Sequence, residues 1–293
     1  MSTPPQPPNN NNTAPPKIIL YRGWDEKGKY VWSPFVTKVE FRLRTSHAAY
    51  TCATGSTQSG PKGKIPYIAL SSLPGPEPET QTEPETQTET ETETETERDK
   101  EYIADSSLIL RTLSARSIVA DVNKPLDKRD KGLDLAIRAL LEDKLYFAHT
   151  HERWLRNFYP MREYALQSIP WPVRVVVGNL AWRSNVRKLF DQGTGRFSDA
   201  ELANMKKEIW EGVAGMLEDS KQGAKDGDSC FWVLGGEQPT EADATLFGFI
   251  VSVLVCTAAP ESNALLRGEG MGIVREYAER IHRRWFADYE HWD

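Results

Sequence analysis

The first part of the chain alternates between apolar patterns typical of strands and of helices. Lys17–Tyr21 is a short apolar run and predicts a buried first strand. A helix is predicted from Pro34, a residue type allowed at the first helical position, to near His47, because apolar side chains recur there four positions apart. A weaker strand is predicted over 49–53 and a stronger one over 65–70.

A fourth strand and a second helix complete this pattern. The run 102–104 predicts the strand, and Asp105 begins a helical pattern that continues through Leu113. The resulting order is strand, helix, strand, and then two strands and a helix, which is typical of a thioredoxin-like domain. We place this domain at residues 17–118.

The remaining residues, 127–293, predict helices. A wide apolar stripe marks the first of them, and its residues are Leu133, Ile137, Leu140, Leu141 and Leu145. Further helices are predicted over 173–190, over 198–217 and over Gly272–Trp285. The pattern indicates a second domain that is all-helical.

Two short motifs mark helix starts in the helical domain. Ser198 and Glu201 stand three residues apart, as in a capping box. Thr240 and Asp243 form a related motif just before an uncharged stretch, 244–260. This stretch is shorter than the roughly 20 apolar residues that a membrane-spanning helix needs. We therefore predict a buried helix there and no transmembrane segment.

Two segments have compositions that cannot bury apolar surface. Residues 1–16 are rich in proline and asparagine, and residues 74–100 are dominated by alternating threonine and glutamate. The alternation resembles a strand, but both residue types are polar and the glutamates repel one another. Both segments are therefore predicted to be disordered, the first as a tail and the second as an insert between two strands.

Charge and cysteine content narrow the class of protein. The 293 residues carry a formal charge of -6, so no nucleic-acid partner is expected, because such surfaces need clustered lysine and arginine. The three cysteines, Cys52, Cys230 and Cys256, are widely spaced, which favours a reducing, cytoplasmic compartment over a disulfide scaffold. His149 and His151 are two residues apart and do not share a helix face, so no metal site is predicted, and we expect them to edge a hydrophobic pocket.

Ser33 stands directly before the predicted helix that begins at Pro34. Its hydroxyl and the first N–H groups of the helix would donate toward an anion near the positive end of the helix dipole. A thiol with a pKa of about 8.5 is mostly protonated at neutral pH, so such donors activate a thiol ligand by stabilising its thiolate. We assign this catalytic role to Ser33, and the alternative is that Ser33 only caps its helix.

The segment Lys64, Ile65 and Pro66 precedes the third predicted strand. Pro66 is a candidate cis-proline that turns the chain so that the backbone of Ile65 faces a peptide-like ligand such as glutathione. Lys64 would neutralise a carboxylate of that ligand. The alternatives are an ordinary trans proline at a strand start and a solvated lysine.

Asp105 and Ser106 supply a second helix start. Asp105 would accept from an amine at the γ-glutamyl end of glutathione, while the Ser106 hydroxyl and nearby N–H groups would bind the adjacent carboxylate. Capping of the helix is again the alternative. Two anion-binding helix starts in one small domain exceed what capping requires.

These motifs together resemble the glutathione S-transferase superfamily, and within it the branch of metaxin and failed-axon-connections (cadmium-resistance-like) proteins. The resemblance covers most of residues 17–293 and rests on the segments 33–40, 63–68, 103–106, 193–197, 236–248 and 277–281. The segment 236–248 is the most specific of them, because it is similar to the capping motif of the superfamily's buried helix. That motif supports folding rather than chemistry.

The resemblance implies an α/β thioredoxin-like N-terminal domain followed by an all-helical C-terminal domain, with glutathione bound between them as co-substrate and no metal. It also implies a possible homodimer. The loop before Ser33 is long for the family, so Tyr21 and Tyr30 stay open as alternative sources of the hydroxyl.

Two functions follow from the resemblance. The first is a glutathione transferase that conjugates glutathione to a small hydrophobic electrophile or uses it for elimination, in detoxification or in metabolite biosynthesis. The second is a non-catalytic adaptor of the same fold or a metaxin-like component of mitochondrial import at the outer surface of the organelle. The sequence does not identify the electrophile.

Overall fold

The computed structural model describes residues 16–24, 26–71, 100–223 and 231–292. The N-terminal part contains a four-stranded sheet with the order β2-β1-β3-β4. Its strands are β1 (Lys17–Tyr21), β2 (Tyr50–Ala53), β3 (Tyr67–Ser71) and β4 (Lys100–Ala104). β2 runs parallel to β1, whereas β3 runs antiparallel to both β1 and β4.

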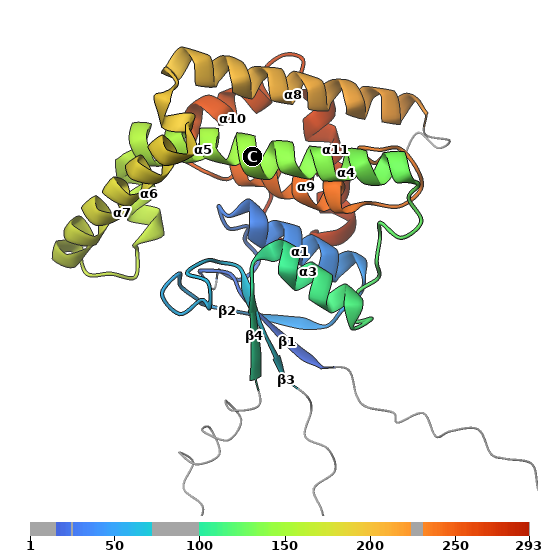
Figure 1. Ribbon diagram of the computed structural model, residues 1–293, viewed down its shortest axis with the longest axis horizontal. Helices are drawn as coiled ribbons and strands as arrows, with labels where there is room; N and C mark the ends of the chain where they lie inside the picture. The colour runs from blue at the N-terminus through green and yellow to red at the C-terminus, as the bar shows by residue number, and fades with distance from the viewer. Residues whose placement is uncertain (1–15, 25, 72–99, 224–230, 293) are drawn as a thin grey trace, which may run out of the picture.

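Two helices, α1 (Pro34–Thr45) and α3 (Ser106–Ala115), lie on one face of this sheet (Figure 1). Their apolar side chains form a core with that face, including Leu20 from β1, Val39 from α1 and Ile109 from α3. Alternate strand residues point to opposite faces, so the same register sends Tyr21 to the other side. The sheet and these helices form the thioredoxin-like unit.

The rest of the described chain is helical and lies above α1 in Figure 1. Its elements are α4 (Lys128–Ala139), the π-helix η1 (Leu140–Leu145), α5 (Tyr146–His151), the π-helix η2 (Glu152–Arg156), α6 (Phe158–Ala165), α7 (Trp171–Gln192), the 3-10 helix η3 (Thr194–Arg196), α8 (Asp199–Gln222), α9 (Glu241–Leu254), α10 (Pro260–Arg267) and α11 (Gly272–Trp285). The predicted fold class, a thioredoxin-like unit followed by a helical unit, is confirmed. No helix among the described residues is long and apolar enough to cross a membrane.

Some predicted boundaries and faces were wrong in detail. β4 begins at Lys100, which the sequence assigned to the insert, because an edge strand pairs through its backbone and tolerates charged side chains. Leu133 is 41% exposed, although the apolar stripe predicted it to be buried. Asp134 takes the buried position because its carboxylate accepts the N–H of Ala242 at 2.7 Å. The predicted tail and most of the predicted insert, residues 1–15 and 72–99, lie outside the described residues.

Helix α1 is buried on every side. Its sequence suggests a helix with one apolar and one polar face, yet Lys38, Glu40 and Arg42 are each exposed by 1% or less. Val39 and Leu43 pack with the sheet, whereas Phe41 lies against Phe247 of α9 in the helical unit. At this contact a Cβ atom on Gly248 would lie 2.3 Å from the carbonyl oxygen of Pro34, so α9 approaches the backbone of α1 directly.

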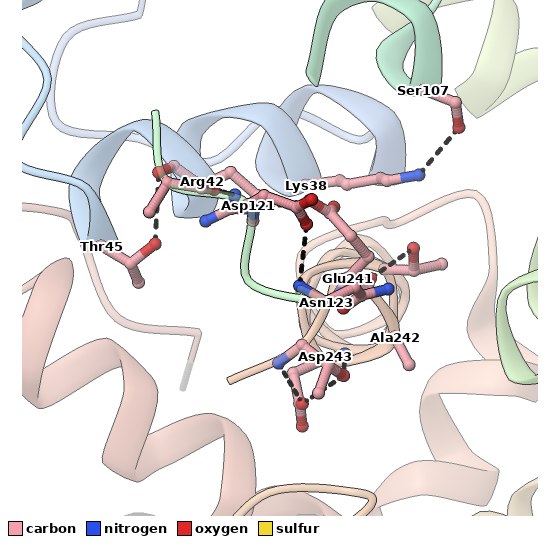
Figure 2. A network of polar contacts seen from close by, with 12 residues as sticks. Lys38, Arg42, Thr45, Ser107, Asp121, Asn123, Glu241, Ala242 and Asp243 are labelled. Carbon is pink, nitrogen blue, oxygen red and sulfur yellow. Dashed lines mark hydrogen bonds and ion pairs between the residues drawn. The ribbon is translucent and has the colours of Figure 1, made fainter. Parts of the chain in front are cut away.

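Polar contacts tie the start of α9 to the surrounding elements (Figure 2). Arg42 of α1 donates to Glu241 at 2.9 Å, and the Asn123 side chain accepts the Glu241 N–H at 3.1 Å. Thr240 and Asp243 form the predicted capping box, which is buried. The helix start therefore joins α1, the segment before α4, and α9.

Asp243 does more than complete the capping box. Its carboxylate accepts the N–H groups of Thr240 and Val233 and the hydroxyls of Thr240 and Tyr277, at 2.7 to 2.9 Å. The predicted box of Ser198 and Glu201 is also present, but it is exposed to solvent. The two boxes share a geometry and differ in burial.

We predict that Asp243→Asn lowers the free energy of unfolding by on the order of 3 kcal/mol, because an amide NH2 would face buried donors. Ser198→Ala is the matched comparison and should cost about 1 kcal/mol, because water replaces the lost bond. Urea unfolding followed by circular dichroism measures both. If both variants lose the same free energy of unfolding, burial does not make the Asp243 box more important for stability than the Ser198 box.

Candidate functional site

The strand register brings two of the three predicted site segments together at one end of the sheet. Tyr67 at the start of β3 pairs with Tyr21 at the end of β1 and with Ala104 at the end of β4. Pro66 and Asp105 are the next residues beyond these pairs and are therefore neighbours across β3 and β4. The loop that contains Pro66 and the start of α3 at Asp105 therefore lie next to each other at this end of the sheet.

The proline segment lies directly before β3. The Ile65–Pro66 peptide bond is cis, and Pro66 is buried. The N–H and C=O groups of Ile65 form no hydrogen bond with any residue that the structure describes. Gly23 lies against this loop, since a Cβ atom there would be 2.9 Å from Cδ1 of Ile65. Lys64, which precedes Ile65, is exposed.

Ser33 precedes α1 in an extended conformation, with φ of -83°. It occupies the N-cap position, yet its side chain makes no capping hydrogen bond. The hydroxyl is partly exposed and has no hydrogen-bond partner among the described residues. The alternative of a purely capping serine is therefore not supported by the geometry, and the hydroxyl stands unused at a helix N-terminus.

The residue before Ser33 is held by the helical unit. The carbonyl oxygen of Trp32 accepts from the Arg153 guanidinium at 3.0 Å and from the Ser252 hydroxyl at 2.5 Å. The Trp32 ring stacks on Tyr164 with centroids 3.6 Å apart, and the Tyr164 hydroxyl accepts the Trp32 N–H at 3.3 Å. Elements η2, α6 and α9 thus fix the position from which α1 begins.

Asp105 caps α3 with only one of its two carboxylate oxygens. Oδ1 accepts the N–H groups of Ser107 and Leu108, each at 3.2 Å. Oδ2 has no hydrogen-bond donor among the described residues. Asp105 also has a φ of 83°, a backbone conformation that residues other than glycine rarely adopt and that is associated with functional sites. Ser106, which follows it, is buried.

A buried lysine that the sequence analysis did not single out lies below these helix starts. Lys38, one turn into α1, donates to the Ser107 hydroxyl at 3.1 Å (Figure 2) and to Glu142 at 2.7 Å. Glu142 belongs to η1 and also accepts from the Thr245 hydroxyl of α9. Lys38 therefore links α1, α3 and the helical unit. No local pattern predicts this role, because lysine in a helix is usually exposed.

The structure places the two alternative tyrosines away from the start of α1. The Tyr30 hydroxyl bonds to Nδ1 of His282 at 2.8 Å, inside a cluster of aromatic rings, and burial raises the pKa of Tyr30. The Tyr21 ring stacks on Tyr67 at 4.4 Å, on the sheet face that α1 and α3 do not cover. The hydroxyl of Ser33 is the one that stands at a helix N-terminus.

Other candidate groups are less available for chemistry. His149 is 3% exposed and packs near Phe249, so it lies in the core rather than at the edge of a pocket, and burial holds its pKa well below the usual range. Burial also raises the pKa of the Cys52 thiol to about 12 and that of Cys256 above its ordinary value. Cys230 lies outside the described residues. Within the described part of the chain, no cluster of side chains is suited to hold a metal ion.

A buried ion pair supports η2, the element that carries Arg153. Glu152 and Lys206 are both nearly inaccessible, with a separation of 2.5 Å, and Glu152 also accepts from the Ser262 hydroxyl and backbone. Burial alone would raise the pKa of Glu152, but Lys206 and Ser262 outweigh it and hold the pKa below the ordinary value. The pair thus fixes the chain next to the contact with Trp32.

Comparison with known proteins agrees with this architecture. The family model described as the glutathione S-transferase N-terminal domain matches residues 91–159. This match crosses the boundary predicted near 118–127, so the division into domains stays a prediction. Among solved structures, glutathione transferase GSTFuA3 from Phanerochaete chrysosporium has a TM-score of 0.56 and 13% identity, and the match covers 96% of this chain and 100% of that chain.

Two further structures are similar at lower scores. Glutathione transferase Omega 1C from Trametes versicolor has a TM-score of 0.47 and 12% identity, with 94% of this chain and 92% of that chain covered. Ure2p in complex with glutathione has a TM-score of 0.47 and 13% identity, with coverage of 94% and 93%. The likeness to the Phanerochaete enzyme shows the fold, which is that of the glutathione transferases.

We predict that the protein loses stability as the pH falls below about 4.5, the ordinary pKa of a glutamate, because Glu152 is ionised in the folded state to a lower pH than in the unfolded chain. Glu152→Gln should lower the free energy of unfolding at pH 7 by on the order of 3 kcal/mol, as measured by urea unfolding. The free energy of unfolding of this variant should also depend less on pH in the acid range. Glu211→Gln removes an exposed partner of Lys207 and serves as the control. A wild-type acid profile in Glu152→Gln would contradict the prediction.

Proposed function

We propose that this protein binds glutathione at the end of its sheet and uses the Ser33 hydroxyl to stabilise the glutathione thiolate. One observation carries the proposal above the others. At the two helix starts, the Ser33 hydroxyl and Oδ2 of Asp105 have no partner among the described residues, although the chain positions both tightly. Capping accounts for neither of these atoms.

Each remaining part of glutathione has a matching group. The unpaired backbone of Ile65 suits the cysteinyl amide, in the manner of an added strand. Oδ2 of Asp105 accepts from the γ-glutamyl amine, and Ser106 with the N-terminal N–H groups of α3 binds the γ-glutamyl carboxylate. Lys64, which is exposed, pairs with the glycyl carboxylate. The family model and the fold support this assignment.

The reaction we propose is attack of the thiolate on an electrophilic carbon. The thiol proton passes to solvent, a sulfur–carbon bond forms, and the leaving group departs with its electron pair. Ser33 and the first N–H groups of α1 lower the thiol pKa from about 8.5, so more thiolate is present at neutral pH. Aromatic rings near the start of α1, such as Phe35 and Tyr146 with centroids 5.2 Å apart, suit a hydrophobic co-substrate.

The competing function is a non-catalytic role as an adaptor or as a metaxin-like import component. Such a protein keeps the fold but does not need an unused hydroxyl at position 33. Detoxification, metabolite biosynthesis, a cytoplasmic location and a homodimer are expectations that accompany the enzymatic proposal. Binding and turnover therefore have to be measured separately.

We predict that the protein binds glutathione and that Ser33→Ala reduces its turnover with an electrophile such as 1-chloro-2,4-dinitrobenzene about 100-fold, while binding changes little. The reason is that the serine acts on the thiolate more than on the bound thiol. Isothermal titration gives the affinity, and the spectroscopic pKa of bound glutathione should rise in the variant. Because Ser33 makes no capping bond, the melting temperature of the variant should equal that of the wild type.

Asp105→Asn tests the second helix start. Asparagine caps a helix as well as aspartate does, so stability should be retained. The lost charge should weaken glutathione binding about 10- to 100-fold. Asp127→Asn is the matched control, because Asp127 caps α4 through the Asp130 N–H. Failure of the wild type to bind glutathione would overturn the proposal, and binding without turnover across a panel of electrophiles would favour the adaptor.

A further inference from the structure

Helix α7 exposes an apolar surface that the fold does not cover. Val173, Val176 and Leu180 are 52%, 61% and 59% exposed, and they recur at the three- and four-residue spacing of one helix face. The opposite face is occupied, because a Cβ atom on Gly178 would lie 2.5 Å from the Arg162 side chain of α6. The exposed side chains therefore form a stripe that points away from the described part of the chain.

The same stripe continues with basic residues. Arg183 and Arg187 follow Leu180 at the same spacing, and both are exposed. Neither makes an ion pair or hydrogen bond with a residue that the structure describes. The whole of α7 carries four basic side chains and one acid, Asp191, and one of the basic residues, Arg174, pairs with Glu163 of α6. The exposed stripe itself therefore ends in two unpaired positive charges among the described residues.

The exposed stripe changes from apolar to basic along the axis of α7. Val173, Val176 and Leu180 come first, and Arg183 and Arg187 follow. Trp171, the first residue of the helix, is 65% exposed. The start of α7 lies at the connection to α6, which extends away from α8 to α11 at the left of Figure 1. Ten residues separate Val173 from Arg183, which corresponds to about 15 Å of helix. The apolar tip and the charges behind it match the depth profile of a lipid surface.

We propose that the α6–α7 hairpin docks on a membrane surface that contains anionic lipids. Trp171 and the aliphatic stripe enter the boundary between headgroups and acyl chains, and Arg183 and Arg187 bind the lipid phosphates. A second copy of the chain fits this stripe less well, because pairing two such helices brings arginines against apolar side chains or against each other. The docking is peripheral and is independent of glutathione binding.

The proposal is tested by flotation of the full-length protein with vesicles at near-physiological salt. We expect wild-type protein to float with vesicles of phosphatidylcholine and phosphatidylserine. With vesicles of phosphatidylcholine alone, it should remain unbound at the bottom of the gradient. Leu180→Glu should abolish flotation. Arg183→Gln and Arg187→Gln should each lower the partition coefficient about fivefold.

Matched controls come from α4. Leu135→Glu makes the same change at a residue that is also 59% exposed, and Lys128→Gln and Arg129→Gln remove exposed basic charges away from the hairpin. These variants should float like the wild type. The proposal is overturned if the wild type does not bind anionic vesicles, or if Leu180→Glu binds as well as Leu135→Glu does. A dimer in light scattering that Leu180→Glu dissociates, without vesicle binding, would assign the stripe to self-association instead.

Discussion

The contact between α1 and α9 is the constraint on which the other features depend. At Gly248 the absence of a side chain lets the backbone of α9 reach the carbonyl of Pro34. This contact lies one residue from Ser33, so the position of the candidate hydroxyl follows from helix packing together with the contacts that hold Trp32. Any side chain at position 248 would separate the two units at the point where the ligand is proposed to bind.

Two polar side chains of α1 are buried where the helical unit packs on the thioredoxin-like unit. Lys38 and Arg42 are each 1% exposed, and each pairs with a carboxylate of the helical unit, Glu142 in η1 and Glu241 in α9 respectively. Ion pairs of this kind add little net stability, but losing one partner leaves a buried charge unpaired. They therefore specify how the units fit together, while apolar packing supplies most of the stability.

The sequence predicted the fold well because its signals were local. Turn and cap residues such as Asp105, Ser198 and Thr240 act within their own helix, and the strands follow from short apolar runs. The three segments of the proposed site could be named from local patterns, but their arrangement in space could not be predicted. The roles of Arg153 and Lys38 were not predictable, because each depends on a partner about 70 or more residues away and has no local pattern.

Charge and apolarity are distributed in an unusual way in the helical unit. Glu152 and Lys206 lie in the interior, whereas Leu180 and Trp171 lie on the surface. The interior charges are explained by each other, because a buried carboxylate and ammonium in contact satisfy one another. No described residue covers the surface apolar side chains, since α6 already occupies the other side of α7. Contacts within the described chain therefore account for the polar interior, and the apolar stripe is the surface that we propose docks on a membrane.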